Sequence, residues 1–247
     1  MLTPFQTHAW ASSPEWLAIA AGVTLGFALL ARALRGVNRS GALAGGLACF
    51  LLFAGAGPVP FATLATLFVM TWVSTRLGYR RKQALGVAER REGRTAWQVL
   101  ANLAVAALGS VVYGATGNRI WLVAALAALT EAATDTVASE IGQYCRADAR
   151  MLTTWECVPA GTDGAITIPG SIAGLAAGLV IAAVPTVGAM LVSGEFGILI
   201  STGFAGMLID SILGATLQRR GWINNQTVNF LSTLAAAALA YAMVRFT

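Results

Sequence analysis

The stretch 59–82 reads VPFATLATLFVMTWVSTRLGYRRK, a mostly apolar run that ends in a cluster of basic residues. An apolar run of about 20 residues is the length that a bilayer-spanning helix requires. Similar runs recur along the 247-residue chain, which is 57% hydrophobic, only 11% charged and has a mean hydropathy of +0.70. Soluble domains carry about 25% charged residues. The sequence therefore predicts an all-α polytopic membrane protein, with residues 1–247 forming a single transmembrane domain.

Apolar runs separated by charged or Gly/Pro-rich breaks predict eight transmembrane helices. Their expected ranges are 16–34, 41–57, 59–78, 96–116, 119–139, 165–190, 196–217 and 227–245. Pro185 lies inside the sixth range, where proline is expected to kink or end the helix.

The basic residues are distributed unevenly between the loops. Fourteen of the sixteen Lys and Arg residues follow the first, third, fifth and seventh predicted helices, and only Arg119 and Arg245 fall on the other side. Under the positive-inside rule these four loops are cytoplasmic and both termini are outside. We therefore expect a protein of a prokaryotic inner membrane whose active face is cytoplasmic. The net charge of +5 fits this bias and attraction to lipid headgroups or phosphates, rather than nucleic acid.

Cysteine and histidine give no sign of a disulfide, zinc or hydrolase site. The three cysteines form no C-x-x-C pair, and the single histidine, His8, is expected on the outer side. No Ser-His-Asp or Cys-His set is therefore available on the cytoplasmic side.

The strongest motif is the acidic segment 131–142, EAATDTVASEIG. Glu131, Asp135 and Ser139 are spaced by four and share one helix face. Glu140 lies about 140° round the helix from Asp135. The two residues can therefore bind one ion together only if the helix unwinds or another segment contributes. A charged residue deep in a membrane costs about 2.5–3.5 kcal/mol. The two interpretations are pairing with arginines at neighbouring helix ends and a cation or proton site.

A second intramembrane acid lies in the segment 210–218, DSILGATLQ. Asp210, Gly214 and Gln218 form one stripe on a helix, with Asp210 about 10 Å from the cytoplasmic end. Together with Asp135 it offers oxygen ligands from two helices. Mg²⁺ commonly binds one or two carboxylates together with water and phosphate oxygens. The same two carboxylates would also serve a proton relay.

The third motif is the glycine-rich loop 158–167, VPAGTDGAIT, which precedes a predicted helix. Gly161, Thr162 and Gly164 are candidates for binding phosphate, because backbone N–H groups at a helix start attract anions. Arg76 and Lys82, on the same side, are candidates for clamping it. Acids, a glycine-rich loop and basic residues on one face are typical of phosphoryl transfer.

Four motifs in order resemble an integral-membrane family that was long of unknown function. They are DTVASEIG at 135–142, VPAGTDGAIT at 158–167, DSILGATLQ at 210–218 and NNQTVNFLS at 224–232, and the resemblance covers about 40–232. Plant chloroplast members of this family include the phytyl-phosphate kinase of tocopherol synthesis. The resemblance implies transfer of a phosphoryl group from a nucleoside triphosphate, CTP being one candidate, to an isoprenyl monophosphate such as phytyl or geranylgeranyl phosphate.

The glycine-rich loop departs from the pattern of that family. Asp163, Ala165 and Thr167 stand where the family has Ser, Gly and Ser. An acid in a phosphate-binding loop repels its ligand unless it binds the metal.

We therefore expect an isoprenyl-phosphate kinase with its lipid tail between helices or in the inner leaflet. Asp135, Glu140 and Asp210 are the expected catalytic residues and Mg²⁺ ligands. The expected supporting polar residues are Glu131, Ser139, Gln218, Asn225 and Asn229. A proton-coupled transporter or lipid flippase that relays protons through buried acids is the first alternative, although the outer loops are nearly bare. A prenol kinase or cytidylyltransferase would use the same site and is the second alternative.

Overall fold

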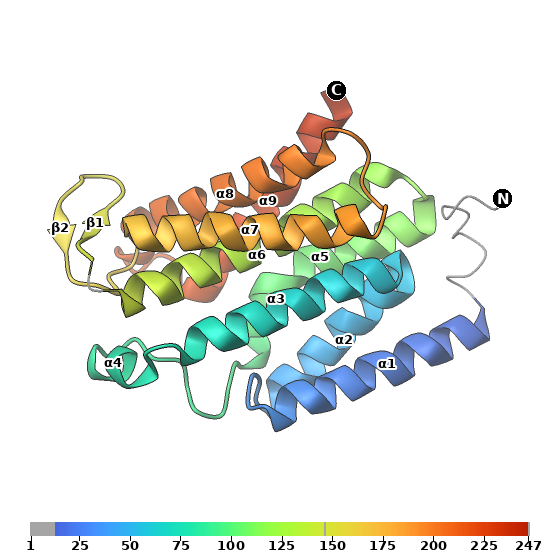
Figure 1. Ribbon diagram of the computed structural model, residues 1–247, viewed down its shortest axis with the longest axis horizontal. Coiled ribbons are helices and arrows are strands. Elements are labelled where there is room, and N and C mark those ends of the chain that lie inside the picture. Colours follow the sequence, from blue (N-terminus) through green and yellow to red (C-terminus); the bar gives the residue numbers. More distant parts are fainter. Residues whose placement is uncertain (1–12, 146, 247) are drawn as a thin grey trace.

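The computed structural model describes residues 13–145 and 147–246, and the described part forms a bundle of long helices around α6 (Figure 1). The long helices are α1 (Pro14–Ala33), α2 (Arg39–Ala56), α3 (Pro58–Arg76), α5 (Ala96–Thr116), α6 (Arg119–Tyr144), α7 (Ile168–Val187), α8 (Glu195–Leu213) with the π-helical turn η1 (Gly214–Gln218), and α9 (Asn225–Phe246). The short elements are α4 (Tyr79–Ala84), β1 (Ala149–Met151), β2 (Cys157–Val158) and β3 (Ala165–Ile166). His8 and Arg146 lie outside the described residues.

The fold class and the eight spans are confirmed. Eight of the described helices are long and apolar enough to cross a membrane. The start of α1 and the end of α9 lie at the same end of the bundle, as an even number of spans requires (Figure 1). Which end faces the cytoplasm stays a prediction.

The boundaries differ from the sequence-based ranges around the loop that follows α6. This helix runs to Tyr144 rather than 139, and α7 begins at Ile168 rather than 165 because Ala165–Ile166 forms β3. Here β1 pairs antiparallel with β2 on one side and β3 on the other. Strands this short leave no alternation that a sequence can reveal. Pro185 lies within α7, which ends two residues later at Val187.

Side-chain caps define where several helices begin. The side chains of Asn38, Asn118 and Thr167 accept hydrogen bonds from the first turns of α2, α6 and α7. Thr95 and Gln98 form a capping box at the start of α5. Such caps satisfy backbone N–H groups that have no partner within the helix.

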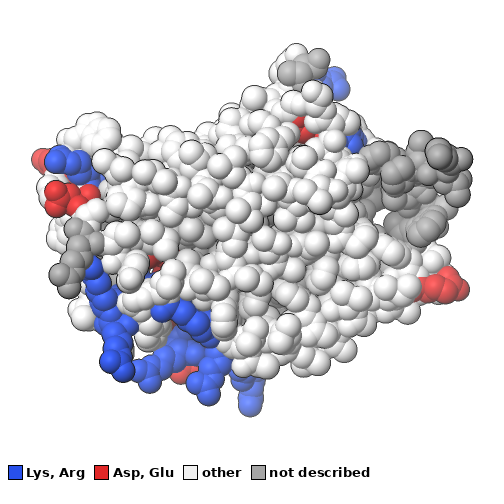
Figure 2. Space-filling view, viewed as in Figure 1, with Lys and Arg blue, Asp and Glu red and all other residues white. Residues whose placement is uncertain are grey.

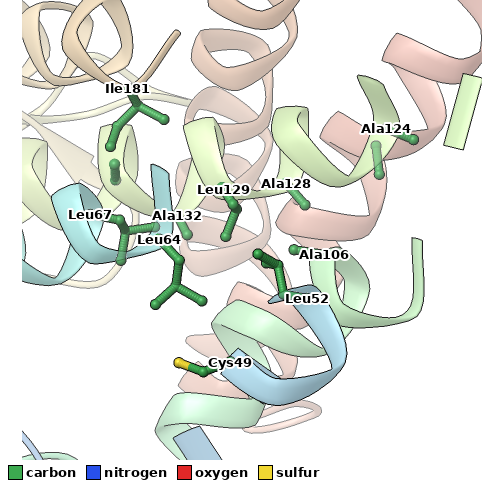
Figure 3. Packing of buried hydrophobic residues seen from close by; sticks show 12 residues of the cluster. Cys49, Leu52, Leu64, Leu67, Ala106, Ala124, Ala128, Leu129, Ala132 and Ile181 are labelled. Carbon is green, nitrogen blue, oxygen red and sulfur yellow. The ribbon is translucent and has the colours of Figure 1, made fainter. Parts of the chain in front are cut away.

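The core is built around α6. In the most apolar stretch of this helix, 89% of the residues are buried. Leu129 and its neighbouring alanines lie against Leu52 of α2, Leu64 of α3 and Ile181 of α7 (Figure 3). Alanine and glycine at these contacts let helix backbones approach closely, which is how membrane helices gain packing energy. This packing fixes α6 in the centre, and with it the acidic motif on its second half.

Charge gathers at one end of the bundle, the end that carries α4 and the β-strands, which we call the basic end (Figures 1 and 2). The other end is mostly uncharged in this view, apart from a few residues near the termini. There, Arg119 forms an ion pair with Glu195 and also donates to the carbonyl of Met190. The asymmetry inferred from the loops is therefore present in the folded protein.

Candidate functional site

A polar cavity of about 410 Å³ opens at the basic end, among α5, α6, α7, α8, η1, α9 and the loop before α7. Its lining combines parts of all four motifs identified in the sequence. From α6 come Asp135 and Ser139, and from the other segments come Gly161, Thr162, Gly164, Asp210, Gln218, Asn225 and Asn229. Residues as far apart in the sequence as Val87 and Asn229 thus meet around one space.

The acidic face of α6 points partly into this cavity and partly into the core. Asp135 and Ser139 line the cavity. Glu131, one turn deeper, is only 1% exposed, and its Oε1 has no hydrogen-bond partner among the described residues. It packs against Gly206 of α8, where an added Cβ would come within 2.4 Å of the Glu131 Cγ. Glycine at this position is therefore what admits a buried carboxyl between α6 and α8.

Asp210 enters the cavity from α8 beside a backbone irregularity. Ser232 of α9 donates a hydrogen bond to Asp210 Oδ2 at 3.2 Å. The helix then widens into the π-helical turn Gly214–Gln218, a feature that often accompanies functional sites. This turn carries Gln218 on the cavity wall.

Five acidic residues line the cavity, namely Glu89, Asp135, Glu140, Asp163 and Asp210, and three of them are aspartates from different segments. Asp163 of the glycine-rich loop lines it together with Asp135 and Asp210. Asp210 lies close enough to both of the others to repel them electrostatically, while Arg94 attracts Asp135. Like charges gathered out of bulk water are unfavourable unless a cation compensates them or the carboxyl groups take up protons.

The glycine-rich loop docks directly on η1. Gly164 has a φ of +77°, and a Cβ there would lie 2.1 Å from the backbone nitrogen of Ala215 and 2.5 Å from the carbonyl oxygen of Ser211. Gly214 faces Gly164 across the same contact. Two of the four motifs are therefore joined backbone to backbone, which requires glycine on both sides.

The individual groups of this loop differ in how free they are to bind a ligand. Both the hydroxyl and the amide of Thr162 donate to the carbonyl of Pro159, so this residue is occupied in forming the turn. Gly161, with a φ of +87°, packs against Val87. In the described structure the amides of Gly161, Asp163 and Gly164 have no acceptor, and the Gly164 nitrogen lies against Gly214 of η1. Backbone N–H groups of this loop, rather than the Thr162 hydroxyl, are the donors that remain for an anion.

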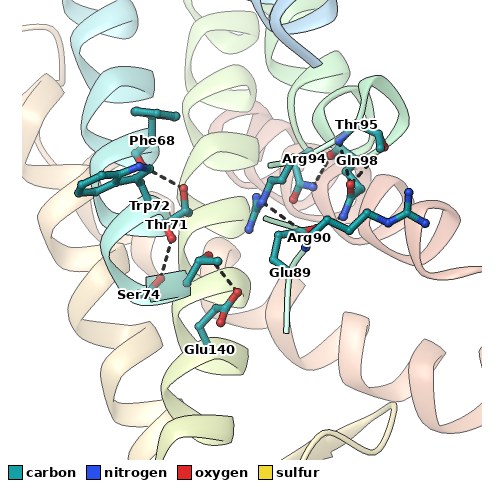
Figure 4. A network of polar contacts seen from close by, with 12 residues as sticks. Phe68, Thr71, Trp72, Ser74, Glu89, Arg90, Arg94, Thr95, Gln98 and Glu140 are labelled. Atoms are coloured by element: carbon teal, nitrogen blue, oxygen red, sulfur yellow. Dashed lines mark hydrogen bonds and ion pairs between the residues drawn. The ribbon is translucent and has the colours of Figure 1, made fainter. Parts of the chain in front are cut away.

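Lys82 and Glu140 do not have the geometry that the sequence suggested. The Lys82 ammonium is 1% exposed and donates to the carbonyls of Ser74 and Thr75 and, at 2.5 Å, to Glu140 Oε2. Thr75 also donates to Glu140 Oε1 (Figure 4). An ammonium has three donors, so Lys82 has none left for phosphate. These hydrogen bonds connect α4 to both α3 and α6. Glu140 can take part because it lies on a different side of α6 from Asp135.

The metal set expected from the sequence stays a prediction: Glu140 lines the same cavity as Asp135 and Asp210, but both of its oxygens accept hydrogen bonds from Thr75 and Lys82. Within 13–145 and 147–246, no group of three or more His, Cys, Asp or Glu residues is placed to hold a metal ion. Asp135 and Asp210 still face one cavity. Two carboxylates with amide and phosphate oxygens fit Mg²⁺, which binds few protein ligands and keeps water or phosphate oxygens. The residues thus fit a phosphate-bound ion and not a cage made by the protein alone.

Arg76 belongs to a second cavity, of about 290 Å³, between α1, α2, α3 and α5. Its guanidinium lies 4.0 Å above the ring of Trp72 and donates to the carbonyl of Leu34 at the end of α1. Phe27, Cys49 and Leu64 line the inner part of this cavity. We call it the apolar cavity. Contrary to the expectation from the sequence, Arg76 does not line the polar cavity.

The two cavities share a wall that sequence reasoning did not assemble. Four residues line both, namely Glu89, Arg94, Gln98 and Asn102. Glu89 accepts a hydrogen bond from Gln98 Nε2 at 2.8 Å and lies 4.0 Å from Arg94 Nε (Figure 4). The sequence signal that was available is Glu89 itself, an acid within a strongly basic segment.

Fold and site together define a polytopic helical membrane protein with an acid-lined polar cavity and an adjoining apolar cavity at one end. Residues 22–237 match the family model described as "Integral membrane protein DUF92", and the chain belongs to this family. The recognition made from the four motifs is confirmed.

Relatives of this chain come from bacteria, archaea and plants. An uncharacterized membrane protein of Synechocystis is 37% identical over 72% of this chain and 70% of its own length. One from Methanocaldococcus jannaschii is 30% identical over 86% of this chain and 87% of its own. "Protein VTE6, chloroplastic" of Arabidopsis thaliana is 29% identical over 95% of this chain and 74% of its own. No solved structure matches.

Proposed function

We propose that this protein is an isoprenyl-phosphate kinase, which transfers the γ-phosphoryl group of a nucleoside triphosphate to an isoprenyl monophosphate. The acceptor phosphate oxygen attacks the γ-phosphorus, the bond to the β-phosphate bridging oxygen breaks, and an isoprenyl diphosphate and a nucleoside diphosphate leave. The reaction would take place at the basic end, which we assign to the cytoplasmic face of a prokaryotic inner membrane. Kinship with the chloroplast relative and the resemblance of the four motifs to the family of the phytyl-phosphate kinase support this activity.

The observation that carries the proposal is the common wall of the two cavities. A phosphoryl donor is polar and binds a cation, whereas an isoprenyl acceptor is apolar with one anionic end. The protein places an acid-lined polar cavity directly beside an apolar cavity with a basic opening. Arg94 and Gln98 lie between them, where the two phosphates of donor and acceptor would meet. Positioning and charge neutralisation are the main requirements of phosphoryl transfer.

In this reaction the cavity residues would bind the metal ion, bind the phosphates and neutralise their charge. Asp135 and Asp210 would hold Mg²⁺ on the donor phosphates, and bound Mg²⁺ would supply neutralisation of the phosphate oxygens. The free amides of Asp163 and Gly164 would donate to the same phosphates. Arg94 would offset the charge that builds up between the two anions. The acceptor is already an oxyanion, so no strong general base is needed.

The transporter alternative requires a path to the opposite end of the bundle. In the described structure both cavities are lined from the basic end, and neither includes a residue of the opposite end. Behind them lie an apolar cluster with Leu122, Leu126 and Leu199 and the Arg119–Glu195 ion pair. This arrangement favours an enzyme with one open face. A prenol kinase or a cytidylyltransferase would be compatible with the same cavity.

The test is phosphoryl transfer by the purified full chain in detergent. Labelled geranylgeranyl or phytyl monophosphate would be offered with CTP, UTP, ATP or GTP and Mg²⁺. We expect the diphosphate with wild type, a loss of at least a hundredfold in Asp135→Asn and Asp210→Asn, and normal activity in Asp148→Asn. Asp148 is exposed and lies outside both cavities. Folded wild type that forms no diphosphate with any donor would overturn the proposal.

A further inference from the structure

We propose that the apolar cavity between α1, α2, α3 and α5 is the acceptor site, and that it takes one isoprenoid chain with its monophosphate among the arginines at the opening. The identity of the occupant rests on the proposed kinase function. The shape, lining and charge of the cavity are independent of it.

The inner part of the cavity is suited to a hydrocarbon chain. Phe27, Cys49, Leu64 and Leu67 line it, and Cys49, Leu64 and Leu67 are almost fully buried. On α2 the lining runs from Gly41 to Cys49, which corresponds to a depth of about 12 Å at 1.5 Å per residue. An apolar space of this kind favours hydrocarbon over any water-soluble group.

The opening of the cavity is suited to a phosphate. Five arginines line the cavity, against a single carboxylate, that of Glu89. They are Arg35, Arg76, Arg90, Arg91 and Arg94. Arginine binds phosphate through several N–H donors at once and keeps its charge near a membrane. In Figure 2 the basic side chains surround a recess at this end of the bundle.

The size of the cavity favours one chain over two. Ligand pockets commonly measure about 300–1,000 Å³, and this one, at about 290 Å³, is at the lower limit. A diacyl phospholipid carries a similar anionic head but twice the hydrocarbon. A single-chain monophosphate therefore fits this volume and charge better than a diacyl phospholipid does.

The wall shared by the two cavities determines which way the phosphate of a bound acceptor would face. Arg94 lines both cavities, and Glu89 holds it near Gln98. A phosphate bound among the arginines would lie beside the wall that faces Asp135 and Asp210. The acceptor would thus reach the donor through this wall while its tail stays in the apolar cavity.

The first test measures binding without nucleotide or Mg²⁺, so that it does not depend on catalysis. Labelled geranylgeranyl monophosphate would be titrated against the full chain in detergent. Gly45 lines the cavity, and a Cβ there meets only Val99 Cγ1 at 3.6 Å, so Gly45→Leu should fill the space. Gly22 of α1 is exposed, has open space around it and lies outside the cavity, which makes Gly22→Leu the matched control.

We expect at least tenfold weaker binding in Gly45→Leu and unchanged binding in Gly22→Leu. The double variant Arg90→Gln/Arg91→Gln should also bind at least tenfold more weakly, whereas Arg39→Gln, an exposed arginine outside the cavity, should not. Geranylgeraniol and inorganic phosphate should each compete poorly. Equal binding by Gly45→Leu, or equal competition by dioleoyl phosphatidic acid, would overturn the assignment.

A second test uses wild-type protein and so does not depend on how a variant folds. A photoactivatable benzophenone analogue of geranyl monophosphate should label peptides of α1, α2, α3 or α5. Labelling confined to α7, α8 or α9 would overturn the assignment. Binding and labelling here without any phosphoryl transfer would leave this site standing and remove the proposed kinase. Phosphoryl transfer that Gly45→Leu does not impair would support the proposed kinase and overturn the assignment of the acceptor site.

Discussion

The contact between the glycine-rich loop and the π-helical turn predicts a large effect of one added methyl group. In Gly164→Ala the new Cβ would lie 2.1 Å from the Ala215 nitrogen and 2.5 Å from the Ser211 carbonyl oxygen. These are backbone atoms and cannot rotate away, so the loop must separate from η1. The substitution is also strained because φ is +77°.

The expected cost has two parts. A non-glycine residue in the left-handed region costs about 1–2 kcal/mol, and overpacking at a closed contact costs about 1–3 kcal/mol. Gly86 provides a matched control, since its φ is +74° and a Cβ there would meet nothing within 4 Å. Gly86→Ala should therefore show only the cost of the left-handed backbone conformation and not the cost of overpacking. At about 2–4 °C per kcal/mol for a chain of this size, Gly164→Ala should melt several degrees below Gly86→Ala.

The assay is thermal unfolding of both variants in the same detergent, followed by phosphoryl transfer at a temperature where both are folded. Gly164→Ala should lose transfer because the amides of Asp163 and Gly164 move away from Asp210. Gly86→Ala should keep it. Melting temperatures within about 2 °C of each other would refute the docking of the loop on η1.

Lys82→Met should lower the free energy of unfolding by about 1–3 kcal/mol, because it leaves the half-buried Glu140 carboxylate without its cation, and Lys82→Met/Glu140→Leu should recover part of this in a denaturation assay. Arg94→Gln should raise the KM for the lipid phosphate and lower kcat together, whereas an effect on only one of them would contradict a position between the two anions. Chelation by EDTA should abolish transfer but leave binding of labelled geranylgeranyl monophosphate intact in the same preparation, and transfer that persists would exclude a Mg²⁺-dependent reaction.

The membrane fold is readable from the sequence because the bilayer imposes simple rules. Apolar runs of the right length predict the eight helices, and all eight are present within the described residues. Arginine placement predicts one basic end, and Figure 2 shows it. The helix that the sequence marks by its acids, α6, is also the central one. These properties depend on local composition, which is why they need no tertiary information.

The grouping of Asp135, the loop 158–167 and Asp210 was also expected, since all three lie at the same helix ends. Their common cavity, however, depends on Gly164 and Gly214 meeting backbone to backbone. A sequence reveals that two glycines exist, not that they touch.

Only the tertiary structure shows which groups Lys82, Glu140 and Arg76 contact. From the sequence, Lys82 and Arg76 are basic residues near a membrane surface, and Glu140 is one more acid on an acidic helix. Folding turns Glu140 towards α3 and buries Lys82 against it, and it places Arg76 on Trp72 in a separate cavity. Composition and periodicity determine which helices form and which end carries charge, because those depend on contacts with lipid and water. Which charged groups meet depends on how the helices rotate and pack against one another, and only the folded protein fixes that.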